Sequence, residues 1–262
     1  MPTIVTEQGT VHYESYGRGR PVILMHGWLG SWELWRDTIE ILGKEFKTYA
    51  LDFFGFGESV DREANFTVDN YVNSVNQFMD KLGIVKAPLI GHSMGGTVSL
   101  AATIRYPDKV VKTVVIGSPI QGKSLNLLLK LSGYRGLASI IWTTPALLRL
   151  FMRGYAYFIA KDGRKMGKML MEDMSKISPD SYFKSIGTLR QTDLTDQLGQ
   201  ITKPVLGIYG RTDQIVRPSQ FKVLQQHAPT SKIAWFEKSG HFPMMDEPDR
   251  FHETIRDFLH NG

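Results

Sequence analysis

Short apolar runs alternate along the chain with segments in which apolar side chains recur every three or four residues. Apolar runs of about four to eight residues are typical of strands buried on both faces of a sheet, and the longer spacing is typical of helices that pack on it. The pattern predicts an N-terminal hairpin around 10–17 and then strands at 20–27, 46–52, 86–93, 109–118, 203–210 and 231–240. It predicts helices at 31–43, 67–83, 95–108, 219–229 and 249–262.

This alternation of strand and helix predicts the fold class. Successive strand–helix–strand units form right-handed crossovers, which build a mainly parallel sheet with helices on both faces. Between about residues 120 and 190 the helical patterns continue without a convincing strand. We therefore expect an α/β fold with a mainly parallel, eight-stranded sheet in a core domain of residues 1–119 and 191–262, and a helical cap inserted at 120–190.

One serine stands between two glycines where a predicted strand turns directly into a predicted helix. The stretch from Gly91 to Gly95 reads Gly-His-Ser-Met-Gly, with Ser93 at its centre. Such a turn forces its central residue into a strained backbone conformation, and side chains two positions away would collide across it. The glycines remove that collision, and Ser93 is expected to project above the sheet beside a helix N-terminus as a nucleophile.

A serine hydroxyl needs a base to accept its proton, so a histidine must lie nearby. His241 follows the last predicted strand, on a loop at the same carboxyl edge of the sheet as Ser93, which makes it the candidate base. The turn is expected to direct His92 away, whereas for His26 a packing role and a functional role are equally compatible with the sequence. The remaining histidines lie on predicted strand or helix surfaces and are expected to be solvated or packed: His12, His227, His252 and His260.

The base in turn needs a carboxylate that fixes its tautomer and stabilises the imidazolium. Asp213 lies just past the end of the preceding strand, on the same sheet edge, and is the preferred acid. Asp52 also ends a strand, but the stretch after it is typical of a tight structural turn. Asp246 and Asp249 begin the last helix, where a carboxylate can serve as a helix N-terminal charge instead.

Two backbone amides are expected to form an oxyanion hole. The loop after the strand at 20–27 reads "HGWLGS", and Gly27 lets the backbone turn so that the amide of Trp28 can face Ser93. The second donor is the amide of Met94, which follows the nucleophile. Both roles use the backbone, so the side chains are expected to matter less.

These motifs together resemble those of the α/β-hydrolase-fold serine hydrolases, and the resemblance spans essentially the whole chain. The segments "HGWLGS", "DFFGFGES", "GHSMGG", "GRTDQIV" and "SGHFPMMDEP" stand in the family's order, with serine before aspartate before histidine. The resemblance assigns the nucleophile to Ser93, the acid to Asp213, the base to His241 and the oxyanion amides to Trp28 and Met94. The motifs resemble those of esterases, of carbon–carbon bond hydrolases of ring-fission products and of perhydrolases alike. Haloalkane dehalogenases and epoxide hydrolases share the layout but carry aspartate as nucleophile, so Ser93 argues against both.

The sequence also bears on compartment. It contains no cysteine, which excludes a thiolate nucleophile or zinc-thiolate site and fits a reducing compartment. The N-terminus lacks the basic start and apolar stretch of a secretory signal. The most apolar segment, 137–152, is shorter than the roughly 20 residues of a spanning helix. We expect a cytoplasmic protein.

Charge distribution sets the expected cap apart from the rest of the chain. The net charge is +5, yet residues 121–170 hold nine lysines and arginines against one acidic residue, Asp162, and so carry +8. These basic residues are interleaved with apolar ones rather than forming a polar stripe, which argues against nucleic-acid binding. The cap is expected mainly to line an apolar pocket, with a possible weak contact to an anionic membrane as the alternative.

The expected function is hydrolysis of carboxylic esters of apolar substrates, with water as second substrate and without cofactor or metal. The alternatives that the residues leave open are carbon–carbon bond hydrolysis or perhydrolysis with the same triad. A third alternative, a ligand receptor on the same fold, is disfavoured because a pure binder does not need all three triad residues.

Overall fold

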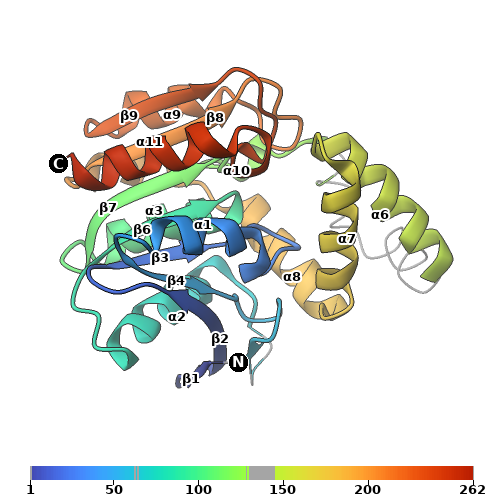
Figure 1. The fold of residues 1–262 in the computed structure, drawn as a ribbon, viewed down its shortest axis with the longest axis horizontal. Coiled ribbons are helices and arrows are strands. Elements are labelled where there is room, and N and C mark those ends of the chain that lie inside the picture. Colours follow the sequence, from blue (N-terminus) through green and yellow to red (C-terminus); the bar gives the residue numbers. More distant parts are fainter. Residues whose placement is uncertain (1, 62, 64, 128, 130–144, 262) are drawn as a thin grey trace.

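The structure is a computed structural model, which describes residues 2–61, 63, 65–127, 129 and 145–261. A single twisted sheet runs through the molecule, with helices on both of its faces and a group of helices beyond one edge (Figure 1). Part of the apolar stretch expected in the cap, residues 137–144, lies outside the described residues.

The sheet has the order β1-β2-β4-β3-β6-β7-β8-β9, with β5 paired to β2. β2 pairs antiparallel with β1, β4 and β5, and the pairs from β4 to β9 are all parallel. The eight expected strands are present, and the ninth, the two-residue β5, is not predicted by the sequence. The bounds are Thr3–Val5 (β1), Gly9–Tyr16 (β2), Pro21–Met25 (β3), Lys47–Leu51 (β4), Val60–Asp61 (β5), Ala87–His92 (β6), Val110–Ile116 (β7), Val205–Gly210 (β8) and Ser231–Phe236 (β9).

Burial explains why the apolar runs are continuous in the middle of the sheet. β3, β6 and β8 are buried along nearly their whole length, whereas the edge strands β1 and β9 are mostly half-buried or exposed. Helices cover both faces of central strands, so most side chains of such a strand are apolar or small. The mainly parallel α/β sheet expected from the sequence is confirmed.

The helices of the core lie close to their predicted positions. α1 contacts α11 on one face of the sheet, and α2 contacts α3 on the other (Figure 1). α2 shows why the pattern works: the Thr67 hydroxyl accepts a hydrogen bond from the Asn70 amide at the N-terminus, and the apolar stripe with Tyr71 and Phe78 is buried. The bounds are Trp32–Trp35 (η1), Arg36–Leu42 (α1), Val68–Lys81 (α2), Met94–Arg105 (α3), Gln220–His227 (α9), Pro243–Asp246 (α10) and Pro248–His260 (α11).

The chain between β7 and β8 leaves the sheet. Its described residues form the 3-10 turns η2 (Gly122–Ser124) and η3 (Thr195–Gln200) and the helices that we call the cap helices: α6 (Pro145–Ile159), α7 (Gly163–Met174) and α8 (Pro179–Gln191). An isolated bridge between Gln121 and Asp193 joins the two ends of this excursion. The cap boundaries at 120 and 190 stay a prediction.

A helix that spans a bilayer needs about 20 mostly apolar residues. Among the residues that the structure describes, none of the helices is both long enough and apolar enough to cross a membrane.

Candidate active site

Ser93 sits at the point where β6 passes into α3. Its backbone has φ 51° and ψ −117°, a conformation that residues with a side chain rarely adopt. A Cβ on Gly91 would collide with the carbonyl oxygen of Gly95, and a Cβ on Gly95 would collide with that of Met25 at the end of β3. The collision across the turn that the sequence predicts is therefore present for Gly91, whereas Gly95 is needed because the end of β3 lies close to it.

His241 and Asp213 form a buried hydrogen-bonded pair. His241 Nδ1 lies 2.8 Å from Asp213 Oδ2, so the ring donates from Nδ1 to the carboxylate. The other carboxylate oxygen, Oδ1, accepts from the backbone amides of Ile215 (2.8 Å) and Val216 (3.0 Å). These two amides fix the carboxylate, and the carboxylate fixes the tautomer of His241, which leaves Nε2 free to accept a proton.

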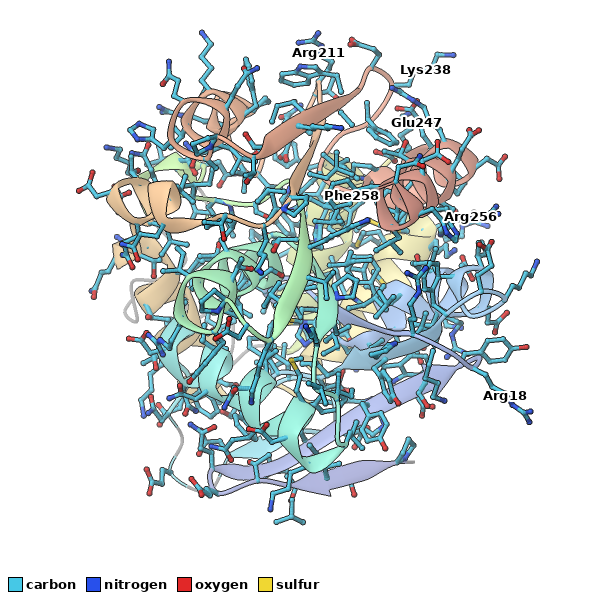
Figure 2. The ribbon with its side chains drawn as sticks, turned by 90° about the vertical axis from the view of Figure 1, so that its left-hand side faces the viewer. Arg18, Arg211, Lys238, Glu247, Arg256 and Phe258 are labelled. Atoms are coloured by element: carbon cyan, nitrogen blue, oxygen red, sulfur yellow. The ribbon has the colours of Figure 1, made fainter. Side chains whose placement is uncertain are left out.

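The loop that carries His241 is held by two further carboxylates. Asp246 accepts a hydrogen bond from the Gly240 amide (2.8 Å). Glu247 accepts from the Lys238 amide (3.0 Å) and the Ser239 hydroxyl (2.7 Å). Glu247 and Lys238 are labelled at the upper right of Figure 2. Asp246 thus supports the loop, and Asp249 lies in the first turn of α11.

Ser93 and His241 line the same cavity, together with Trp28. Because β6, β8 and β9 are parallel, the residues after them meet at one edge of the sheet. The cavity measures about 40 Å³ and lies between this edge and the cap helices. Its lining is otherwise mostly apolar: Leu29, Leu125, Leu129, Tyr155, Ile159, Leu170, Ile186, Leu189, Ile215 and Phe242.

The loop after β3 approaches the serine closely, and a Cβ on Gly27 would lie 3.1 Å from the Cβ of Ser93. The ring of His26 holds this loop through two hydrogen bonds. Its Nδ1 donates to the Gly27 carbonyl oxygen (2.7 Å) and its Nε2 accepts from the Phe53 amide (3.0 Å). Burial lowers the pKa of His26, and the nearby Asp52 and the bond to Gly27 only partly oppose this. Between the two roles left open by the sequence, the structure gives His26 the packing role.

His92 differs from the expectation. Its ring packs against that of His241, with centroids 4.6 Å apart, and lines the same cavity. Nε2 donates to the His241 carbonyl oxygen (2.9 Å). Burial and the neighbouring His241 hold the pKa of His92 well below its usual value. The expectation that the turn directs His92 away from the site is wrong, because this hydrogen bond draws its ring toward the histidine loop.

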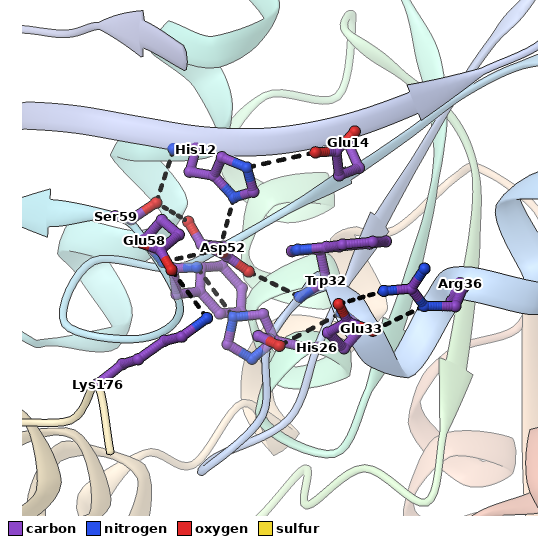
Figure 3. A network of polar contacts seen from close by, with 12 residues as sticks. His12, Glu14, His26, Trp32, Glu33, Arg36, Asp52, Glu58, Ser59 and Lys176 are labelled. Carbon is purple, nitrogen blue, oxygen red and sulfur yellow. Dashed lines mark hydrogen bonds and ion pairs between the residues drawn. The ribbon is translucent and has the colours of Figure 1, made fainter. Parts of the chain in front are cut away.

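The remaining candidates are engaged elsewhere. Asp52 is fully buried in a polar network in which it accepts from His12 Nδ1 (2.8 Å), the Trp32 amide (2.7 Å) and the Glu58 amide (3.0 Å) (Figure 3). This confirms the structural turn expected after Asp52. Two other histidines pair outside the site: His252 with Thr38 and His260 with Glu45.

Asp173 on α7 is a buried acid that the sequence does not single out. Its side chain is 2% exposed, and this burial raises the pKa of Asp173 to about 7. The hydrogen bond with Ser31 and the positive charge of Lys176 lower the pKa and offset part of this rise. The charges of Asp52 and Glu33 also raise it. No spacing signal marks this residue, because its neighbours come from distant segments.

Replacing Asp173 with asparagine is expected to change how stability depends on pH. The folded chain keeps a proton on Asp173 that the unfolded chain releases between about pH 4 and 7, so the free energy of unfolding falls as pH rises through that window. Asparagine stays neutral, so Asp173→Asn is expected to raise the free energy of unfolding at pH 8 by on the order of 1–3 kcal/mol and to change it little at pH 5. Urea unfolding at both pH values measures this, with the exposed Asp257→Asn as control; an equal effect at both pH values would contradict it.

Comparisons with known proteins bear on the fold and on the class of enzyme. A family model described as "alpha/beta hydrolase fold" matches residues 20–136. A pimeloyl-[acyl-carrier protein] methyl ester esterase from Vibrio parahaemolyticus serotype O3:K6 is 27% identical over 256 residues, which cover 95% of this chain and 97% of the relative.

Two solved structures extend the similarity to the whole fold. A thermophilic esterase from Thermogutta terrifontis has a TM-score of 0.83 and 24% identity and covers 98% of this chain and 97% of its own. The meta-cleavage product hydrolase CumD, from Pseudomonas fluorescens IP01, has a TM-score of 0.83 and 26% identity and covers 100% and 98%. The chain therefore has the α/β-hydrolase fold, and its similarity to named esterases supports a carboxylic ester hydrolase.

Proposed function

We propose that the chain hydrolyses carboxylic esters with apolar acyl groups through an acyl-enzyme on Ser93, with His241 as base and Asp213 as orienting acid. One observation carries the proposal: His241, hydrogen-bonded to the buried Asp213 at 2.8 Å, lines the same cavity as a serine held at φ 51°. A strained conformation that the surroundings enforce is typical of a functional position.

The reaction proceeds in two halves. His241 Nε2 takes the proton of Ser93 Oγ as the oxygen attacks the ester carbonyl carbon, and the amides of Trp28 and Met94 stabilise the negative oxygen of the tetrahedral intermediate. The intermediate collapses when His241 gives its proton to the leaving alcohol. Water then loses a proton to His241 and attacks the acyl-enzyme. When this second tetrahedral intermediate collapses, His241 returns the proton to Ser93 Oγ and the carboxylic acid leaves.

The cavity favours an apolar acyl group of limited size. About 40 Å³ is far below the roughly 300–1,000 Å³ of sites for drug-sized ligands. A short to medium acyl chain or an aromatic group matches its apolar lining, whereas a charged group would be buried there without a partner. The Vibrio relative is named for a methyl ester, so methyl esters belong among the substrates to be tested.

A substrate panel tests this function. Turnover is measured on p-nitrophenyl esters of graded chain length, on methyl esters and on a ring-fission diketone, and perhydrolysis is measured with acetate and hydrogen peroxide; Ser93→Ala serves as blank. We expect Ser93-dependent hydrolysis that is fastest on short to medium esters. Turnover of the diketone alone would favour carbon–carbon hydrolysis, an alternative that the similarity to CumD supports. A single burst without further cycling would favour a receptor.

The outer face of α6 supports a second partner, an anionic lipid surface. Leu150, Tyr157 and Phe158 are 69%, 57% and 50% exposed, which is unusual for large apolar side chains. Arg149 and Arg153 accompany them along the helix and line a groove of about 420 Å³ with α7. Apolar side chains beside cations are typical of helices that lie in an anionic interface.

Co-sedimentation with phosphatidylglycerol vesicles tests this contact. We expect binding at low salt that is lost at high salt, because ions screen the attraction between the arginines and the headgroups. The double variant Tyr157→Ser, Phe158→Ser is expected to bind less, whereas Val85→Ser, at the opposite edge of the sheet and 76% exposed, is expected to bind normally. No vesicle binding at low salt would leave the cap helices with the role of a pocket lid. The cytoplasmic location stays a prediction of the sequence.

A further inference from the structure

The side chain of Trp28 ties the loop after β3 to the cap helices. Its Nε1 donates to the hydroxyl oxygen of Ser185 on α8 at 3.1 Å, and its ring packs against Tyr182 with centroids 4.7 Å apart. We propose that Ser185 is a positioning residue, which holds the Trp28 indole and thereby sets the Trp28 backbone amide where the oxyanion develops. This inference rests on the proposed function, in which that amide is an oxyanion donor.

The loop needs such support because its conformation is strained. Leu29, directly after Trp28, has φ 62°, a region that favours glycine. A branched side chain stays there only where its surroundings enforce it. Within the loop, the Gly30 amide donates to the Gly27 carbonyl oxygen (3.2 Å), and this single turn bond does not reach the indole.

Supports on the two sides of the loop come from different parts of the molecule. On the core side, Asp52 accepts from the Trp32 amide (Figure 3). On the cap side, Ser185 accepts from Trp28, and Asp173 on α7 forms a hydrogen bond with Ser31. The cap helices therefore hold the loop just before and just after Leu29, so the oxyanion loop is complete only when α7 and α8 are seated on the core.

Ser185 is suited to accept the indole proton. It is fully buried, and its hydroxyl donates to the carbonyl oxygens of Ser181 and Tyr182 in its own helix. With its single proton directed there, the oxygen presents a lone pair to Trp28 Nε1. Ser185 does not line the cavity with Ser93, so its loss would leave the indole N–H without a partner but remove no contact to an acyl group in that cavity.

Steady-state kinetics of Ser185→Ala test the proposal. We expect kcat to fall about tenfold or more with KM within about twofold, because a displaced oxyanion donor weakens binding of the transition state rather than of the substrate. The inhibition constant of a trifluoromethyl ketone, whose adduct with Ser93 places an oxyanion in the same hole, is expected to rise by the same factor. Ser185→Thr, which keeps the hydroxyl, is expected to restore most of both.

Two further variants separate this role from general stability. Trp28→Phe keeps an aromatic ring without the N–H and is expected to match Ser185→Ala, with the double variant no worse than either single one. Ser178→Ala removes the N-terminal cap of α8 and is expected to lower the melting temperature while leaving kcat and the inhibition constant unchanged.

The outcomes are distinguishable. Full kcat in Ser185→Ala, or a loss of kcat without weaker binding of the trifluoromethyl ketone, would overturn the positioning role while leaving the proposed function intact. If Ser93→Ala itself kept ester turnover, the proposed function would fail first and the role of Ser185 with it.

Discussion

Replacing Ser93 with alanine is expected to lower kcat for ester hydrolysis by about 10⁴-fold or more while the fold is retained. Alanine has no oxygen to attack the ester, and the residual rate would come from the oxyanion amides and from substrate binding. Turnover of a p-nitrophenyl ester by the purified variant, with circular dichroism as a check on folding, measures the effect.

Ser99→Ala is the matched control for this change. Ser99 is a buried serine of the same helix whose hydroxyl bonds to the Gly95 carbonyl oxygen, and it does not line the cavity. We expect it to keep most of the activity. An Ser93→Ala protein that retained more than a few per cent of the normal rate would rule out Ser93 as the nucleophile.

Replacing Asp213 with asparagine is expected to lower kcat by about 10³-fold or more. Asparagine can keep the amide bonds of Ile215 and Val216 through its oxygen, but it would then point an NH₂ group at Nδ1 of His241. This favours the tautomer with the proton on Nε2, which cannot accept the proton of Ser93. His241→Ala is expected to cost at least as much.

Combining these changes tests whether the three residues act as a unit. The double variant Ser93→Ala, Asp213→Asn is expected to be little slower than Ser93→Ala alone, because the carboxylate has no role without the nucleophile. Losses that add up would argue against a shared mechanism. Asp246→Asn keeps an oxygen for the Gly240 amide and is expected to stay active, so its inactivity beside an active Asp213→Asn would move the acid to Asp246.

Local sequence patterns account for most of what could be predicted. Ser93, Asp213 and His241 each follow a strand of the parallel sheet, so their position at one shared edge can be inferred from strand order alone. The need for glycine on both sides of Ser93 could also be inferred from the sequence, because larger side chains would collide in a tight strand-to-helix turn. Elements set by one strong local signal, such as α2 with its Thr67 cap and apolar stripe, are also found as predicted.

Contacts between distant segments account for what could not be predicted. β5 and α10 are too short to show a period in the sequence. The hydrogen bond from Trp28 to Ser185 joins residues 157 positions apart, so the sequence does not show that the Trp28 side chain contacts a cap helix. The ring of His92 is drawn to the carbonyl of a residue 149 positions away, against the expectation from the turn.

Covalent labelling with a fluorophosphonate tests the central claim most directly, because this reagent modifies a serine that an adjacent base activates. We expect the label on the tryptic peptide 87–105, located to Ser93 by fragmentation, absent in Ser93→Ala and formed much more slowly in His241→Ala. A label on any other residue, or an active esterase that takes up no label, would contradict the account.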